Sequence, residues 1–273
     1  MALTVNYNSA SGNAMNNVSR TQRNLAKSFA RISSGLRITS AADDAAGLAV
    51  SENMDADTRS LRQAARNTND GISVIQTVEG ATEEVTDMLK RMRELAVQSR
   101  SETLDSTSRG YADEEYKALF GEINRISAVT EFNGVSLGDT DKTINVQVGI
   151  GASSTNDVIG IKLEDFDAGA LALTADISDT TNAGLALDTL DTAIDSVNSL
   201  RSGFGAVQNR LESALNNLET YTENLSSSVS RIRDADFAFE TAELSKHQIM
   251  QQAGISILGQ ANGLNSGALR LIG

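Results

Sequence analysis

Hydrophobic side chains recur every three or four residues near both ends of the chain. Near the amino terminus the repeating positions are Met15, Val18, Gln22, Leu25, Phe29, Ile32 and Leu36, a heptad stripe with one polar member. Near the carboxyl terminus they are Ile249, Ala253, Ile257, Ala261, Leu264, Ala268 and Leu271. This spacing predicts two amphipathic helices. Because a narrow apolar stripe needs a partner to cover it, we expect the two ends to pair with each other, with copies of themselves, or with both.

Helical periodicity also fills most of the chain between these ends. It predicts a first helix over about 11–37, a long helix over about 41–99, a third over about 109–127, and a fourth from about 185 to 232. Ser40 and Asp43 resemble a capping box at the start of the long helix. Gly71 and Gly80 lie inside that helix, and since glycine weakens a helix, a bend or break is favoured near them if anywhere.

A short central stretch alternates hydrophobic and polar residues instead. Its hydrophobic positions are Ile144, Val146, Val148, Ile150, Ile159, Ile161 and Leu163. Period-two alternation in two runs predicts one β-hairpin over about 143–164. The Phe132-Asn133-Gly134 segment predicts a turn before the hairpin, and residues 167–183 read as an irregular connection after it.

The order of these elements predicts a mainly α protein. We expect a long antiparallel helical bundle or coiled coil built from both chain ends, with one small β-hairpin region in the middle. Residues 1–43 and 232–273 are predicted to be the amino- and carboxy-terminal helical halves of one domain. Residues 44–231 are predicted to form a central long-helix bundle domain that carries the hairpin.

Composition narrows the functional classes. The chain has 273 residues with no proline, so nothing in it forces a long helix to break. It has no cysteine, which excludes disulfides and thiol chemistry. A net charge of −13 argues against nucleic-acid binding. The first seven residues lack the basic and apolar regions of a cleavable signal, and no apolar run is long enough to insert into a membrane.

The residues give little support to an enzyme or a metal site. The only histidine is His247, and nothing marks a serine and an acid as its partners, so a polar role in a helix interface is favoured. Asp234, Asp236, Glu240 and Glu243 form an acidic group that we interpret as a solvated helix face. No zinc-protease or nucleotide-binding motif is present. We therefore predict no catalytic, cofactor-binding or metal-binding residues.

Several segments of the sequence resemble segments of bacterial flagellins. The amino-terminal segments are Ser33-Ser34-Gly35-Leu36-Arg37-Ile38, Ala42-Asp43-Asp44-Ala45-Ala46-Gly47-Leu48, Arg66-Asn67-Thr68-Asn69-Asp70-Gly71-Ile72-Ser73 and Arg93-Glu94-Leu95-Ala96-Val97-Gln98-Ser99. The carboxy-terminal segments are Gln251-Gln252-Ala253-Gly254 and Gln260-Ala261-Asn262. They occur in collinear order over nearly the whole chain. The short middle indicates a minimal form without inserted outer domains.

The resemblance implies a subunit that polymerises into the hollow, extracellular flagellar filament for motility. It implies that the two terminal stripes form the seam of an inner tube. Implied partners are the chain itself, a secretion chaperone at about 232–273, the filament cap and hook-junction proteins. Export without signal cleavage is also implied. The alternative within the same superfamily is the hook–filament junction protein.

The resemblance further implies recognition by the host Toll-like receptor 5. The positions that match the receptor-contacting residues of recognised flagellins are Arg91, Leu95 and Glu115. Arg91 and Leu95 are four residues apart on a predicted helix, so we expect them to share a face. Arg91 and Glu115 are also adequately explained as ordinary solvated charges.

Overall fold

The computed structural model describes the backbone of residues 8–270 and the side chains up to Gly263. It divides into two compact units. The terminal unit comprises residues 1–56 and 224–273, and the central unit comprises residues 57–223. The predicted seam residues Leu264, Ala268 and Leu271 have side chains outside the described residues.

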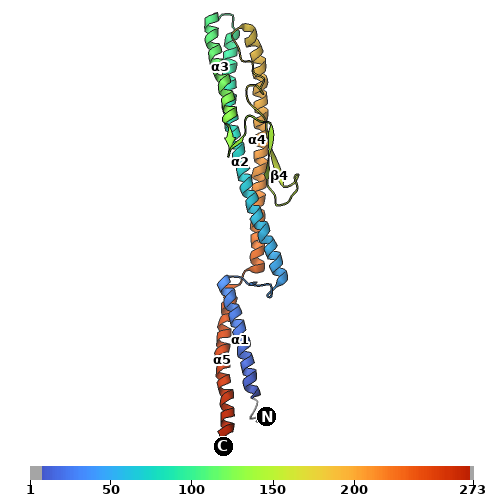
Figure 1. Cartoon of the computed structure of the whole chain (residues 1–273), viewed down its shortest axis with the longest axis vertical. Helices are drawn as coiled ribbons and strands as arrows, with labels where there is room; N and C mark the ends of the chain where they lie inside the picture. The colour runs from blue at the N-terminus through green and yellow to red at the C-terminus, as the bar shows by residue number, and fades with distance from the viewer. Residues whose placement is uncertain (1–7, 271–273) are drawn as a thin grey trace. The chain divides into compact units, whose positions relative to one another are not determined.

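The terminal unit is built on two antiparallel helices, α1 (Ser9–Ser34) and α5 (Phe237–Arg270), which lie side by side (Figure 1). The Asn8 side chain caps α1 by accepting a hydrogen bond of 3.0 Å from the Ser11 N–H. At the other end Gly35 adopts φ +72°, and its N–H donates to the Arg31 carbonyl at 2.8 Å. This left-handed cap ends α1 because glycine adopts that conformation without a Cβ clash.

The chain leaves α1 beside the break between α4 (Thr180–Arg233) and α5. The Arg37 N–H donates to the Arg233 carbonyl at 2.7 Å, and the Ala235 N–H donates to the Gly35 carbonyl at 2.9 Å. These reciprocal bonds satisfy backbone groups that a helix end would otherwise leave unpaired. They hold the two helix breaks together within the terminal unit.

The helix α2 (Ala45–Arg100) begins later than the sequence predicts. Asp44, not Ser40, caps it by accepting from the Gly47 N–H at 2.9 Å. Asp43 instead serves the preceding turn, where it pairs with Lys27 at 2.6 Å and accepts from the Thr39 hydroxyl at 2.9 Å. The hydrogen bond from Lys27, followed by that from Thr39, holds the pKa of Asp43 well below its usual range.

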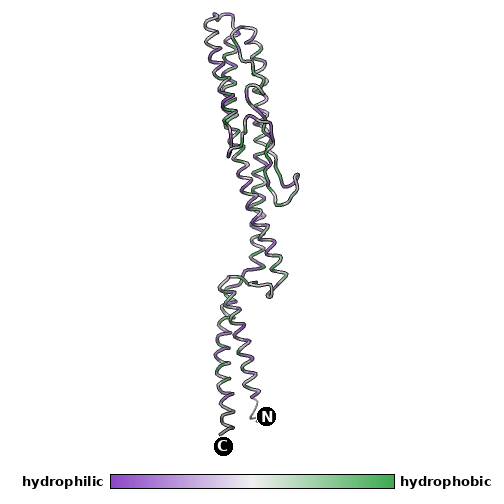
Figure 2. The backbone as a smooth tube through the Cα atoms, in the orientation of Figure 1, coloured by the Kyte–Doolittle hydropathy of each residue, from purple (hydrophilic) through white to green (hydrophobic). Residues whose placement is uncertain are grey.

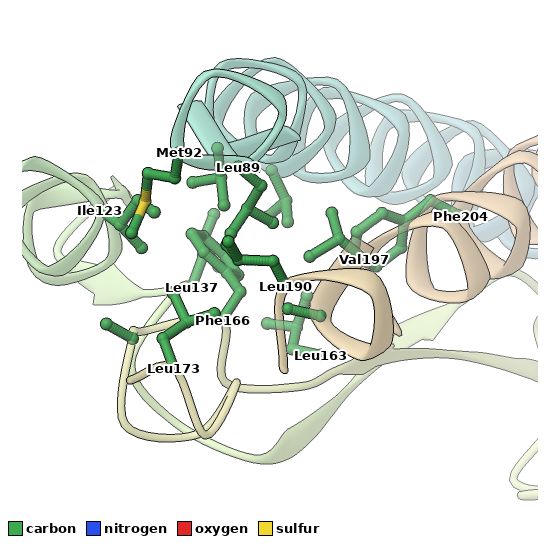
Figure 3. Close-up of a cluster of buried hydrophobic side chains, with 14 of the residues drawn as sticks. Leu89, Met92, Ile123, Leu137, Leu163, Phe166, Leu173, Leu190, Val197 and Phe204 are labelled. Atoms are coloured by element: carbon green, nitrogen blue, oxygen red, sulfur yellow. The ribbon is translucent and has the colours of Figure 1, made fainter. Parts of the chain in front are cut away.

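The central unit packs α2, α3 (Ser106–Val129) and α4 side by side around one hydrophobic core (Figures 1 and 3). On α4 the fully buried residues Leu190, Val197, Phe204 and Leu211 recur every seven residues. Such a heptad keeps one side of the helix toward its partners. The connection before α4 also enters the core, through Phe166 and then through Ala168, Leu173 and Ile177. The irregular connection predicted over 167–183 is therefore partly a core element.

The described residues form two small antiparallel sheets, one more than the single hairpin that the sequence predicts. Strand β1 (Glu131–Phe132) pairs with β2 (Val135–Ser136) across the Asn133-Gly134 turn, where both residues have positive φ, +50° and +75°. Strand β3 (Lys142–Gln147) pairs with β4 (Val158–Leu163) in the register Ile144 to Ile161. The second pair matches the predicted hairpin; the first is an addition that the sequence indicated only as a turn.

No break occurs in α2 at its two central glycines. Gly71 is buried, and a Cβ there would lie 2.9 Å from Val146 Cγ2 on β3. Glycine at this position allows the hairpin to approach the helix closely. Gly80 has no such neighbour within 4 Å. The first glycine is therefore a packing feature and not a hinge.

Helix breaks lie near the domain boundaries predicted from the sequence, at residues 35–44 and 234–236. The division between the compact units falls further along, inside α2 and α4. The predicted fold class, a mainly α protein with an antiparallel helix pair from the chain ends and β structure in the middle, is confirmed.

Candidate assembly surface

The two terminal helices meet along a heptad set that shares some positions with the predicted stripe and lies one residue aside at others. On α1 the buried residues are Ala14, Thr21 and Ser28, and Val18, Leu25 and Ile32 are half-buried between them. On α5 the least exposed residues include Glu240, His247, Gly254 and Ala261, again seven apart. Small and polar residues thus occupy most of the buried positions of the pair.

A close approach explains why small residues occupy this interface. A Cβ added at Gly254 would lie 2.7 Å from Val18 Cγ2, closer than carbon atoms pack. The two backbones can come together because glycine stands opposite valine. Sequence reasoning missed this feature, although Thr21 and Ser28, seven residues apart, carried a signal of it.

Polar contacts fix the register of the pair at both ends. At one end the Asn8 side-chain amide donates to the Ala261 carbonyl at 3.0 Å, and the Ser11 hydroxyl donates to Asn262 Oδ1 at 2.9 Å. At the other end Arg31 Nη1 lies 2.9 Å from Glu240 Oε1. The Glu240 side chain is only 5% exposed. The prediction that Glu240 belongs to a solvated acidic face is therefore wrong, because Arg31 of the opposite helix neutralises it.

His247 lies on the side of α5 that faces α1. Its Nε2 is 3.4 Å from Glu243 Oε2 on the same helix, and its Nδ1 is buried without a hydrogen-bond partner. Among the residues that the structure describes, no three His, Asp or Glu side chains gather as a metal site. None of the described helices has an apolar stretch that could cross a bilayer.

Several residues of the predicted seam lie on the outside of this pair. Met15, Phe29, Ile249 and Ile257 are exposed by 64%, 66%, 67% and 56%. Ala253 is exposed too, whereas Val18, Leu25, Ile32 and Leu36 are half-buried and Ala261 is buried. Hydrophobic positions recur along both helices in Figure 2. Phe237, Phe239, Met250 and Ile255 are also exposed, and we call these four together with Met15, Phe29, Ile249 and Ile257 the terminal apolar surface.

The terminal unit buries little hydrophobic area of its own. Among its described residues, the buried hydrophobic ones are Ala14, Ile38 and Ala261, two of them alanines. The main hydrophobic core lies wholly within the central unit. Because each exposed large side chain forgoes about 1.5–3 kcal/mol of burial, the terminal unit is far from saturating its apolar surface.

The three residues predicted for receptor contact do not all share a surface. Arg91 Nε lies 2.8 Å from Glu115 Oε1 across α2 and α3, and both side chains are nearly half exposed. Hydrogen bonds to Glu115, then to Glu94, raise the pKa of Arg91 above its usual value. Leu95 is 2% exposed and belongs to the core. Leu95 lies four residues from Arg91 on α2, but the packing of the helix turns its side chain into the core and away from solvent.

Fold and surface together define a class: α-helical proteins whose two chain ends pair into one antiparallel unit and leave apolar surface uncovered. Two family descriptions match the sequence, the bacterial flagellin N-terminal helical region over residues 5–143 and the bacterial flagellin C-terminal helical region over residues 187–272. The chain belongs to the bacterial flagellin family, whose members are structural subunits of the flagellar filament.

Individual relatives agree with this assignment. The flagellin of Halalkalibacterium halodurans is 43% identical over 274 residues, covering 99% of this chain and 100% of that protein. The crystal structure of Bacillus cereus flagellin aligns with a TM-score of 0.51 at 35% identity, covering 56% of this chain and 88% of that one. A Vibrio parahaemolyticus protein described as flagellar hook-associated shares the fold, with a TM-score of 0.61 at 14% identity over 70% of this chain and 100% of that one.

Proposed function

We propose that this flagellin polymerises into a hollow helical filament by burying the terminal apolar surface against neighbouring copies. The observation that carries the proposal is the mismatch among the described residues of the terminal unit, where three hydrophobic residues are buried while the eight large ones of the terminal apolar surface are exposed. Repeated contacts between unlike surfaces extend into a helical polymer when their rotation does not close into a ring. Such a tube would transmit torque as a propeller.

The proposal predicts how free subunits behave. A pair of helices held by small side chains and a few polar contacts is marginally stable in water. We expect backbone amides of α1 and α5 to exchange with solvent quickly in the free subunit and to become protected in the filament. Equal protection in both states, measured by hydrogen–deuterium exchange, would argue against closure by assembly.

A single charge on the terminal apolar surface tests the proposal. Phe29→Asp or Ile257→Asp should abolish filaments and leave the central unit folded, since burying an unpaired charge costs several kcal/mol. The matched controls Phe29→Leu and Ile257→Val keep the positions apolar and should give filaments. Electron microscopy after induced polymerisation provides the measurement, and circular dichroism checks folding. Filaments from both charged variants in normal yield would refute the surface assignment.

The same experiment addresses the alternative function. A hook–filament junction protein shares helical termini with flagellins, but it would not form long tubes by itself. We infer a filament role because the relative from H. halodurans, at 43% identity, spans the whole chain, whereas the hook-associated protein shares the fold at 14% identity. Wild-type protein that forms no long tubes under any polymerising condition would favour the junction role.

Further partners follow from family membership as proposals. We propose that the exposed carboxy-terminal helix is masked before assembly by a secretion chaperone that binds about 232–273. Export would proceed without signal cleavage, and the cap and hook-junction proteins would contact the filament ends. The uncovered apolar face of α5 supports the chaperone proposal, because such a face invites premature association. Deleting residues 232–273 should abolish chaperone co-purification.

We also propose recognition by Toll-like receptor 5 through Arg91 and Glu115, the paired and accessible charges of the predicted set. Leu95 would act by supporting α2 from the core. Arg91→Ala and Glu115→Ala should each weaken receptor signalling in a reporter cell, while Lys162→Ala, a change of an exposed charge on β4, should not. Full signalling by both variants would refute the assignment.

A further inference from the structure

Charge is divided unequally between the two units. The central unit carries 28 Asp and Glu against 14 Lys and Arg, a net charge of −14. The terminal unit carries 8 Asp and Glu against 9 Lys and Arg, a net charge of +1. The acidity of the whole chain, −13, therefore resides in the central unit.

The most basic part of the terminal unit is its amino-terminal helix. No Asp or Glu occurs before Asp43, and α1 carries four cations, Arg20, Arg23, Lys27 and Arg31. Spacings of three and four residues place these cations along one side of the helix. Lys27 and Arg31 are paired within the terminal unit, with Asp43 and Glu240. Among the described residues, Arg20 and Arg23 are exposed and make no ion pair.

Arg20 and Arg23 lie on a different side of α1 from Phe29 of the terminal apolar surface. At 100° per residue, Arg20 lies about 180° and Arg23 about 120° around the helix from Phe29. Burying Phe29 against a neighbouring copy therefore leaves these arginines free for a different contact.

The central unit presents an acidic stripe of the same length. Glu212, Glu219 and Glu223 of α4 are exposed and fall within about 40° of one another around the helix. From first to last they span about 16 Å, as do Arg20 to Arg31 of α1. Within the described residues none of these three forms an ion pair, and Glu212 only accepts a hydrogen bond from Gln208.

We propose that the basic side of α1 docks on the acidic stripe of α4 in a second copy of this chain. This contact rests on the proposed polymerisation and adds an electrostatic interface to the apolar one. Oppositely charged surfaces speed encounter and fix register, whereas like charges at the same place oppose contact. Individual exposed ion pairs contribute little, so the effect depends on several charges acting together.

Charge reversal tests the contact. At low ionic strength Arg20→Glu with Arg23→Glu should raise the critical concentration for polymerisation at least about tenfold, because like charges then face each other. Glu219→Lys with Glu223→Lys should do the same. A control that matches the net charge of the α1 variant, Arg125→Glu with Arg210→Glu, alters exposed cations elsewhere on the central unit and should stay within about twofold of the unmodified chain.

Mixing the two variants identifies the partner. An equimolar mixture of the α1 variant and the α4 variant should copolymerise where neither polymerises alone, since reversed charges meet only between different copies. The proposal is overturned if the α1 variant polymerises like its control, or if only a chain carrying all four changes recovers, which would place the contact within one chain. If charge reversal has no effect while Phe29→Asp still abolishes filaments, the electrostatic contact is refuted and the proposed function is not.

Discussion

Gly71 and Gly80 offer a sharp test of how the hairpin is held against α2. Both lie in the middle of the same unbroken helix, and only their surroundings differ. A Cβ at residue 71 would lie 2.9 Å and 3.2 Å from the two methyl groups of Val146, and 3.5 Å from Leu211 Cδ1. A Cβ at residue 80 would meet nothing within 4 Å.

Opposite outcomes are expected for alanine at the two positions. Gly80→Ala should raise the free energy of unfolding by about 1 kcal/mol, because alanine favours the helix. Gly71→Ala gains the same helix preference, but overpacking against Val146 costs about 1–3 kcal/mol. Its net effect should therefore range from neutral to a loss of about 2 kcal/mol, leaving the variants about 1–3 kcal/mol apart.

Chemical unfolding of the monomeric subunit, followed by far-ultraviolet circular dichroism, measures the difference. A second-site change adds a rescue. Val146→Ala alone removes two buried methyl groups and should cost about 2 kcal/mol. In the Gly71→Ala background it should cost at least about 1 kcal/mol less, because the new methyl group occupies part of the vacated space. Equal shifts of the unfolding midpoint for Gly71→Ala and Gly80→Ala would refute the close-approach argument.

Two other substitutions address the core and the helix pair. The Tyr116 hydroxyl donates to the Thr174 carbonyl at 2.9 Å, and burial, with a smaller effect of nearby Asp113, raises the pKa of Tyr116 to about 12. The folded state therefore retains a proton that the unfolded chain loses above about pH 10, so the free energy of unfolding should fall as pH rises from 10 to 12. Tyr116→Phe should lower the free energy of unfolding by about 1 kcal/mol near neutral pH. It should also remove this alkaline decline, as measured by unfolding curves recorded over a pH series. Gly254→Ala should lower the melting temperature of the filament, because its methyl group would overlap Val18. Gly259→Ala on the same helix is the control, since a Cβ there meets open space in the subunit. Equal melting temperatures for the two variants would argue against the close approach of α1 and α5.

The sequence by itself determined which segments are helical and what class of protein they build. Periodic hydrophobic positions and the absence of proline specify long helices, and alternation at 144–150 and 159–163 specifies the larger hairpin. These are local properties, because side-chain direction follows directly from helix or strand geometry. The segments that resemble flagellins occur in collinear order and identified the family, because they too can be recognised without a structure.

Only the tertiary structure decided which side of each helix meets which partner. The stripe of Met15 and Phe29 looked like the natural contact of α1, yet α5 packs one residue aside, over Thr21 and Ser28. Backbones come closest where side chains are small, and the partner that supplies the space, Gly254, is more than two hundred residues away. In the same way Leu95 turned inward while Arg91 stayed outside, and Gly71 proved to be a contact with the hairpin. Periodicity reports that a helix has an apolar side, but the shape of a distant neighbour selects the residues that touch.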